Sequence, residues 1–167
     1  VLGMRMCMKS GVGTASIHIA AQGDVTVGAI VVVNAMGDVV DPRTGDIIAG
    51  ARDPETGKFI DTVKWMMLSR PKLRQGNTTI GVVATNARLD KSGATKVAQM
   101  AHDGLARAIR PVHTMADGDT IFALSTGNAV ADINVIGTAA AEVIAEAVVR
   151  AVKAAKDAAG VPGLAGK

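Results

Sequence analysis

Gly76-Asn77-Thr78-Thr79-Ile80-Gly81-Val82 is the stretch of this chain from which its fold and its chemistry are best read. Its two threonines stand at the head of an apolar, β-branched run that is typical of a strand. If the peptide bond before Thr78 is cut, the freed α-amine lies on the same residue as the hydroxyl. Such an amine has an ordinary pKa of about 8, so near neutral pH it accepts the hydroxyl proton without a separate histidine. The stretch makes Thr78 a candidate nucleophile at the start of a strand, and the segments that follow it in the chain make the case.

The composition indicates one compact unit with a core of small side chains. The 167 residues suffice for one core, so we expect a single domain over 1–167. Hydrophobic residues make up 49% of the chain and aromatic residues 2%, so Ala, Val, Ile and Met must fill closely packed layers of helix on sheet. The chain opens at Val1 in an apolar stretch without an initiating methionine, so we expect part of a larger domain.

Charge and cysteine content exclude several classes of partner. The net charge of +3 and the isoelectric point of about 9.3 are mild, and the basic residues have no interleaved aromatics, so no nucleic-acid partner is expected. No apolar run approaches the roughly 20 residues of a membrane span, so no membrane partner is expected either. The single Cys7 excludes an internal disulfide and fits a reducing compartment. We expect a cytoplasmic protein, with a periplasmic location left open.

Hydrophobic periodicity outlines the elements. Apolar runs predict strands over 12–20, 25–34, 79–85 and 120–125. Helical patterns predict helices over 94–109 and from Asp132 or Asn134 to about Ala159. Segment 41–76 is rich in Pro, Gly and basic residues, which indicates a flexible connector that has room for a helical turn over 62–68. The order predicts an α+β fold, and periodicity alone leaves open a sandwich with helices outside two sheets or a two-layer arrangement.

Several ordered segments resemble one known family. They are Lys9–Ser16, Val32–Ala35, Asn77–Ala87, Ala101–Ile109, His113-Thr114 and Asp117–Gly127. Together they resemble the self-cleaving aminopeptidases, which include L-aminopeptidase/D-esterases, β-peptidyl aminopeptidases and nylon-oligomer (6-aminohexanoate-oligomer) endohydrolases. The resemblance implies a four-layer α-β-β-α sandwich like those of N-terminal-nucleophile hydrolases and ornithine acetyltransferases.

The resemblance also implies self-processing. The cut would fall between Asn77 and Thr78, leaving an upstream fragment, 1–77, associated with a nucleophile-bearing fragment, 78–167. It implies a homo-oligomer, typically a tetramer of processed pairs. The family is longer at its N-terminus and supplies a tyrosine to the site from there, whereas this chain has no tyrosine. The Asp117/Asp119 pair resembles the nylon-hydrolase branch.

Thr78, Asn77 and Asn34 are the first candidate site residues. Thr78 is expected to be the nucleophile, against the alternative of an ordinary strand residue. Asn77 would precede the cut bond, against the alternative of a turn residue with positive φ. Asn34 ends an apolar strand, where an amide needs hydrogen bonds. We expect its NH₂ to stabilise the oxyanion, against the alternative of a strand-end turn residue.

Lys9, Asp117 and Asp119 complete the expected site. Lys9 beside the nucleophile would favour the alkoxide and keep the amine basic, and Gly11 and Gly13 would let the backbone approach. A solvated lysine is the alternative. The two aspartates, two residues apart, would hold the Thr78 amine or a substrate amine. A solvated Asp-Gly-Asp turn is the alternative.

Other reactive side chains are given structural roles. We expect His18 to be a bonded core residue, His102 to pack within its helix, and Cys7 to be a buried inert thiol. A metal site at His113 with the aspartates lacks a second histidine at ligand spacing, so we expect no metal and no cofactor.

These inferences lead to one main function and two alternatives. The main one is an autoprocessed amide hydrolase acting on peptides, β-peptides or 6-aminohexanoate oligomers, with small or linear amino acid units. An acyl transferase of the same fold differs in using an amine as acceptor. A non-catalytic oligomeric scaffold would remain one intact chain.

Overall fold

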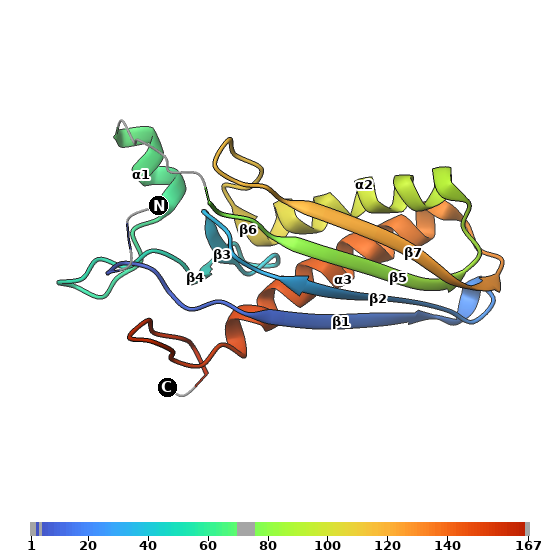
Figure 1. Cartoon of the computed structure of the whole chain (residues 1–167), viewed down its shortest axis with the longest axis horizontal. Helices are drawn as coiled ribbons and strands as arrows, with labels where there is room; N and C mark the ends of the chain where they lie inside the picture. Colours follow the sequence, from blue (N-terminus) through green and yellow to red (C-terminus); the bar gives the residue numbers. More distant parts are fainter. Residues whose placement is uncertain (1–2, 4, 70–75, 166–167) are drawn as a thin grey trace.

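A four-stranded sheet is the centre of the molecule in the computed structural model, which describes residues 3, 5–69 and 76–165. Among these residues, the strand order is β1 (Val12–Ile19), β2 (Val25–Val32), β5 (Ile80–Ala87) and β7 (Thr120–Ala129). β1, β2 and β5 pair antiparallel, and β5 pairs parallel with β7 (Figure 1). The four strands predicted from the apolar runs are therefore confirmed.

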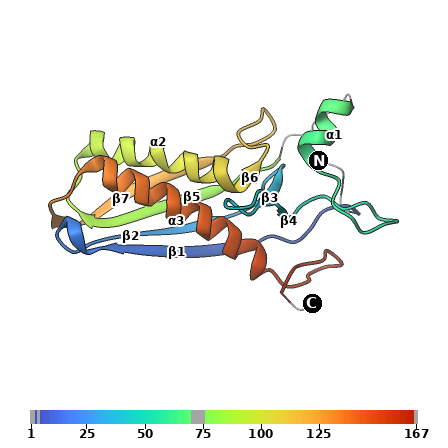
Figure 2. The same cartoon turned by 180° about the vertical axis from the view of Figure 1, so that it is seen from behind.

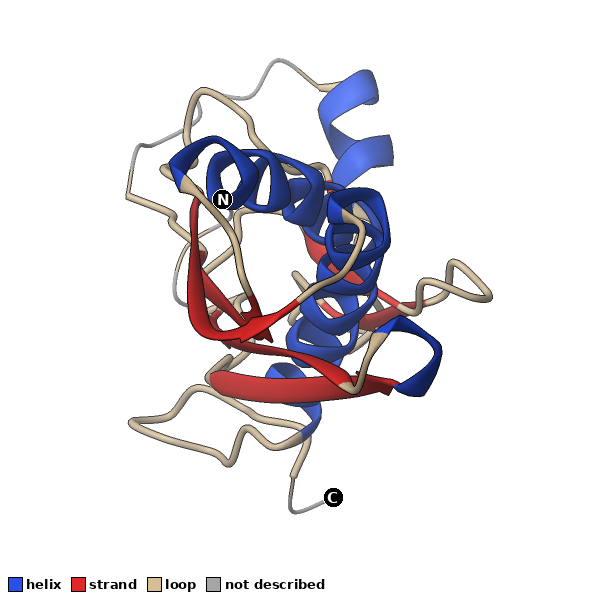
Figure 3. Cartoon of the chain, turned by 90° about the vertical axis from the view of Figure 1, so that its right-hand side faces the viewer, coloured by secondary structure: helices blue, strands red, loops and turns tan. Residues whose placement is uncertain are grey.

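Two long helices, α2 (Lys91–Ala108) and α3 (Ile133–Lys153), cover one face of this sheet (Figures 2 and 3). Alternate strand residues point toward them, and Val27, Val31 and Val83 are wholly buried there. The small side chains allow close packing, since a Cβ on Gly104 of α2 would collide with the backbone of α3. Full burial of one such valine contributes about 1.5–3 kcal/mol, so this layer supplies most of the core.

The opposite face of the sheet, hereafter the outer face, is also apolar but exposed. Its large side chains come from all four strands and are 43–58% exposed: Val12, Ile30, Val32, Ile80, Phe122 and Leu124. In the strand register Val12 lies opposite Val32 and Val32 opposite Ile80, so these side chains form a continuous surface. Apolar surface of this extent is typical of a face that packs against another layer.

The segment between β2 and β5 forms a short helix and two strands of a smaller sheet, whose third strand follows α2. Within the described residues the sheet has the order β4 (Ile47–Ala49), β3 (Asp38–Val40) and β6 (Ile109–Arg110), and the helix is α1 (Thr62–Leu68). The helical turn at 62–68 was predicted. The small strands were not predicted, because runs of two or three residues carry no periodicity. The 41–76 segment thus holds β4 and α1 as well as turns, and its flexibility remains a prediction.

One buried carboxylate joins α1 to the smaller sheet. Asp38 is 2% exposed and accepts hydrogen bonds from Thr62 N (2.6 Å), Thr62 Oγ1 (2.9 Å) and Ala51 N (3.2 Å). Burial raises the pKa of Asp38, and the hydrogen bonds from Thr62 oppose that rise. Gly50 leaves room for the carboxylate, since a Cβ there would collide with it.

The predicted helix boundaries need two corrections. Asp90 caps α2 through Gly93 N (2.6 Å), and the helix begins at Lys91 rather than Ala94. Of the two residues expected at the start of α3, Asp132 is its cap, yet the helix ends at Lys153 and not near Ala159. Beyond it the chain forms turns, because Asp157 accepts a hydrogen bond from Gly163 N (2.7 Å) and Gly160 takes a φ of 78°. No helix of the described ranges is long and apolar enough to span a membrane.

Candidate active site

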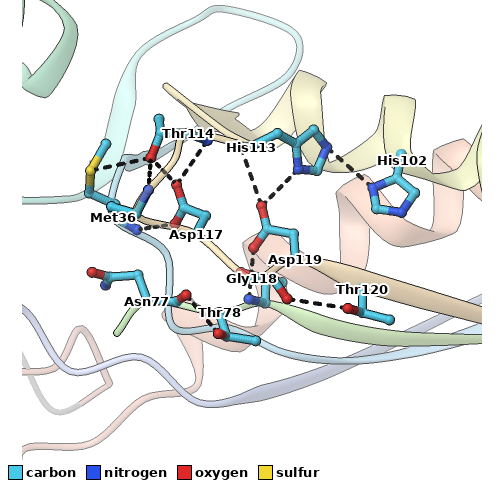
Figure 4. Close-up of polar contacts among 12 residues, drawn as sticks. Met36, Asn77, Thr78, His102, His113, Thr114, Asp117, Gly118, Asp119 and Thr120 are labelled. Carbon is cyan, nitrogen blue, oxygen red and sulfur yellow. Dashed lines mark hydrogen bonds and ion pairs between the residues drawn. The ribbon is translucent and has the colours of Figure 1, made fainter. Parts of the chain in front are cut away.

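The backbone around Thr78 is held between two strands of the large sheet. Thr78 N donates to Asn34 O, just beyond β2, at 2.9 Å. On the other side Asn77 forms a parallel bridge with Asp117, just before β7. Because β5 lies between β2 and β7, the two chain segments that flank Thr78 meet it at one end of the sheet (Figures 1 and 4). Thr78 is therefore fixed by main-chain contacts on both sides.

The Thr78 hydroxyl is hydrogen-bonded to the carbonyl oxygen of the preceding residue, Asn77. Thr78 Oγ1 donates to Asn77 O at 2.6 Å, and Gly118 N donates to the same oxygen at 2.9 Å (Figure 4). A Cβ on Gly118 would come within 2.9 Å of Thr78 Oγ1, so a side chain there would displace the hydroxyl. The chain is continuous at this bond, and the carbonyl already has a backbone N–H donor of the kind that stabilises an oxyanion.

Asp119 connects this region to two histidines. Its side chain is 3% exposed, and its Oδ1 accepts from Thr79 N at 2.8 Å. Its Oδ2 contacts His113 Nδ1 at 2.8 Å, and His113 Nε2 lies 3.2 Å from His102 Nδ1 (Figure 4). Burial, followed by the proximity of His113, lowers the pKa of His102. His102 was expected only to pack within its helix, and this contact across to His113 was not foreseen.

Both carboxylate oxygens of Asp117 accept hydrogen bonds, and those to Oδ2 come from the loop that carries Asp117. Its Oδ1 accepts from Met36 N (3.2 Å), and its Oδ2 accepts from Thr114 N (3.2 Å) and Thr114 Oγ1 (2.7 Å). These contacts fix the loop between β6 and β7 against the chain that follows β2. The two aspartates thus have different partners: Asp119 receives the N–H of Thr79, and Asp117 receives N–H groups of its own loop and of Met36.

Asn34 and Lys9 share a cavity with Asn77 and have other hydrogen-bond partners in the uncut chain. Asn34 Nδ2 donates to Gly76 O at 3.3 Å, one carbonyl before the one that Thr78 contacts. Lys9 Nζ donates to Ser10 O at 2.6 Å. The cavity that Lys9, Asn34 and Asn77 line has a volume of about 560 Å³.

The remainder of this cavity is lined mainly by apolar side chains. Methionines contribute much of its wall, together with Val33, Val152 and Val161. Cys7 also lines it and is half-buried, so the expectation of a buried thiol is only partly met. The cavity therefore combines a flexible apolar wall with polar groups at the end near Asn77.

Two sequence expectations are corrected by position. His18 is not a core residue: its side chain is 54% exposed on the outer face, 3.1 Å from Asp24. Register explains the error, since His18 pairs with Thr26 and both point away from the helices. Gly13 serves packing against α3 rather than the site, because a Cβ there would meet the Ala147 carbonyl.

Gly118 was not singled out from the sequence, and His113 was weighed with the aspartates only as a metal site. The aspartates themselves were expected to hold the Thr78 amine or a substrate amine, with a solvated Asp-Gly-Asp turn as the alternative. The signal was available, since a glycine between two candidate site residues permits close backbone approach. In the described parts of the chain, no three His, Cys, Asp or Glu side chains gather as a metal site.

Comparison with known proteins gives consistent matches over nearly the whole chain. The model of peptidase family S58 matches residues 2–165. An uncharacterized aminopeptidase of Mycobacterium leprae is 45% identical over 93% of this chain and 47% of its own length. A 6-aminohexanoate-oligomer endohydrolase of Kocuria is 34% identical over 78% of this chain and 42% of its own. The chain thus spans about half the length of these curated relatives.

Solved structures agree in fold. A β-aminopeptidase of Burkholderia superposes with a TM-score of 0.60 and 26% identity, over 95% of this chain and 48% of the other. An L-aminopeptidase D-Ala-esterase/amidase of Ochrobactrum anthropi, described as a variant of the Ntn-hydrolase fold, gives a TM-score of 0.64 at 24% identity, over 93% and 43%. The α+β class is confirmed, and the fold neighbours are Ntn-hydrolase-type aminopeptidases.

Proposed function

This chain belongs to peptidase family S58, and from that premise we propose that it is an amide hydrolase that cuts itself before Thr78. The new N-terminal threonine then serves as the nucleophile. The observation that carries the proposal is the Thr78 hydroxyl, 2.6 Å from the oxygen of the preceding carbonyl, which Gly118 N also contacts. A hydroxyl and a backbone N–H that both contact this carbonyl group supply the nucleophile and the oxyanion donor that self-cleavage needs.

Self-cleavage proceeds in two balanced steps. Thr78 Oγ attacks the Asn77 carbonyl carbon, and the negative charge that forms on Asn77 O is stabilised by Gly118 N–H. The C–N bond then breaks, the amine keeps the proton that the hydroxyl gave up, and an ester joins Asn77 to Thr78 Oγ. Water hydrolyses the ester, which leaves a carboxyl group on Asn77 and a free hydroxyl and amine on Thr78.

Turnover repeats this chemistry on an external amide. The free amine of Thr78 takes the hydroxyl proton, Oγ attacks the substrate carbonyl, and the amine returns the proton to the leaving nitrogen. Water then hydrolyses the ester on Thr78 Oγ, which releases the carboxylic acid and restores the hydroxyl. Asn34, whose Nδ2 already binds the neighbouring carbonyl of Gly76 at 3.3 Å, is proposed to stabilise the substrate oxyanion. Lys9, on the same cavity wall, is proposed to keep the amine unprotonated.

The proposed substrates are amides of small or linear amino acids. Two observations support this choice: relatives are named aminopeptidases and 6-aminohexanoate-oligomer endohydrolases, and the cavity beside Asn77 has a largely apolar wall with methionines. Unbranched methionine side chains adapt to linear chains because they have several rotatable bonds. Hydrolysis of a short 6-aminohexanoate oligomer and of an amino acid p-nitroanilide would separate the two substrate types.

We also propose that the outer face receives a second sheet, which would complete the four-layer α-β-β-α sandwich. The support is its continuous apolar surface, from Val12 on β1 to Phe122 on β7. The curated relatives are about twice as long as their matched portion, so they have chain enough for a second sheet. A homo-oligomer of processed pairs is likewise proposed, and size-exclusion chromatography with light scattering tests it.

The decisive test of the function is the mass of the purified protein. Self-cleavage predicts two associated fragments, one of which begins at Thr78, and Thr78→Ala predicts one uncut chain. Active protein in which residues 77 and 78 remain joined would overturn the proposal.

A further inference from the structure

A line of polar contacts runs from the backbone next to Thr78 to a helix of the opposite layer. Thr79 N donates to Asp119 Oδ1, Asp119 Oδ2 accepts from His113, and His113 contacts His102 on α2 (Figure 4). The successive distances are 2.8, 2.8 and 3.2 Å. The proposed self-cleavage and turnover steps use neither histidine, so they assign no role to His113 or His102.

The proton positions along this line follow from donor and acceptor chemistry. Carboxylate oxygens only accept, so His113 Nδ1 carries a hydrogen in every state in which Asp119 is ionised. When His113 is neutral its Nε2 is then an acceptor, and His102 Nδ1 donates to it. If both rings were cationic, two N–H groups would face each other at 3.2 Å.

Asp119 has little freedom once both of its oxygens are engaged. Its side chain is 3% exposed, whereas the His113 side chain is 38% exposed. His113 also has a left-handed backbone, with a φ of 55°, and its own N–H lies 3.4 Å from Asp119 Oδ2. Non-glycine residues adopt this conformation at a cost in free energy, which the contacts of His113 with Asp119 must offset. The ring and the backbone of His113 both converge on one carboxylate oxygen.

We propose that His113 is a positioning residue for the reaction at Thr78. By holding Asp119 Oδ2 it directs Oδ1 to Thr79 N, and so fixes the strand start that keeps the Thr78 hydroxyl on the Asn77 carbonyl. This inference rests on the proposed self-cleavage. Asp119 is the group through which His113 acts, and His102 supports the ring from α2.

Four variants of the full chain test it through the rate of self-cleavage after synthesis. His113→Asn keeps an N–H donor near the place of Nδ1 and tolerates the left-handed backbone. His113→Gln has its amide one bond further out, and His113→Ala has no donor. His18→Ala is the matched control, since it removes an exposed His–carboxylate pair. His18 lies opposite Thr26, which is six residues along β2 from Val32 and so about 20 Å from the site end of the sheet.

The expected rates separate positioning from general stability. His113→Ala and His113→Gln should slow cleavage by about ten- to a hundredfold, the range for losing a hydrogen bond to a charged group. His113→Asn should stay within about threefold of the unaltered chain, and His18→Ala should match it. Melting temperatures are measured in parallel, because a structural role would lower stability and rate together.

A spectroscopic readout follows the pair directly. The groups that face His102 are His113, Asp119 and Asp103, and the charge of His113 is among those that lower the His102 pKa. In His113→Asn that charge is gone, so the NMR titration midpoint of His102 should rise. An unchanged midpoint would mean that the two rings are not in contact.

Each result decides between the two proposals. Cleavage of folded His113→Ala at the unaltered rate would overturn the role of His113 and leave the proposed function standing. If His113→Ala does not fold, equal rates for the Asn and Gln variants would overturn the same role. Failure of the unaltered chain to cut at all would overturn both.

Discussion

Gly118→Ala is the substitution that most directly probes the geometry at Thr78. The new Cβ would lie 2.9 Å from Thr78 Oγ1 but 3.9 Å from Asn77 O, so the conflict falls on the hydroxyl alone. Carbon atoms do not approach a neighbour this closely, and the Thr78 backbone is held by Asn34 O at 2.9 Å. The side chain must therefore rotate into another staggered position, which takes its oxygen away from the Asn77 carbonyl.

The size of the effect follows from that displacement. Rotation into another staggered well moves the oxygen by more than 1 Å, and a 1 Å misplacement of a reacting group is worth about a hundredfold in rate. We expect self-cleavage to slow by about that factor, which corresponds to about 2.7 kcal/mol in the barrier. The rotamer change itself costs only about 0.5–1.5 kcal/mol of stability, so the variant should fold.

The assay is a time course of intact mass after the chain is made, with circular dichroism to confirm folding. Gly11→Ala is the matched control, because its Cβ would have ordinary contact with Ala151 O at 3.5 Å. It should cut at the unaltered rate. A folded Gly118→Ala that cuts as fast as the unaltered chain would refute the inference that the hydroxyl acts from its observed position.

Three further outcomes follow from the structure. Thr78→Ser should still cut, since it keeps the hydroxyl, whereas Thr78→Ala should not cut, as read by mass. For Asp38, burial raises the folded-state pKa, so the folded chain binds a proton at a higher pH than the unfolded chain does, and stability is lost as pH rises through that pKa. The free energy of unfolding of the unaltered chain minus that of Asp38→Asn, from urea titrations, should therefore fall from about pH 4 toward neutrality. Phe122→Asp, at a position that is 58% exposed, should lower the free energy of unfolding by about 3–5 kcal/mol if a second sheet covers the outer face.

Each of these has a clear contrary result. A cut Thr78→Ala chain would remove the hydroxyl from the reaction. If the free energy of unfolding of the unaltered chain minus that of Asp38→Asn rises with pH, the pKa of Asp38 is lowered by folding and not raised. A change within about 0.5 kcal/mol for Phe122→Asp would indicate that the outer face stays in water.

The main elements of the fold were open to prediction because they repeat a pattern over many residues. The strand around Val25–Val32 is a continuous apolar run, and the helix around Val97–Leu105 presents an apolar face at the helical period. The small sheet was missed because strands such as β6, of two residues, are specified by their partners rather than by their own sequence. The end of α3 was misplaced because alanine favours a helix equally on both sides of Lys153, and tertiary contacts decide where it stops.

The sequence names candidate residues for the site but not the contacts between them. Asn34 and Thr78 lie far apart in sequence and meet through the pairing of β2 with β5. Which oxygen each side chain contacts depends on loop geometry that no spacing encodes. The two aspartates illustrate this limit: equal in sequence, they differ in space because the loop at Thr114 encloses only Asp117.

In the proposed cycle, the uncut chain would be its own first substrate. Gly76 and Asn77 supply two successive carbonyls, one bound by Asn34 Nδ2 and the other by Gly118 N. After self-cleavage, a bound substrate would present one reacting carbonyl to both donors, whereas the uncut chain presents a separate carbonyl to each. The Thr78→Ser chain, which is expected to cut itself and then to hydrolyse substrate, is a background in which the roles of the two donors can be separated. In that background Asn34→Ala should lower turnover more than processing, since the Asn77 oxygen already has the Gly118 donor. Equal losses in both steps would mean that a single oxyanion site serves the whole cycle.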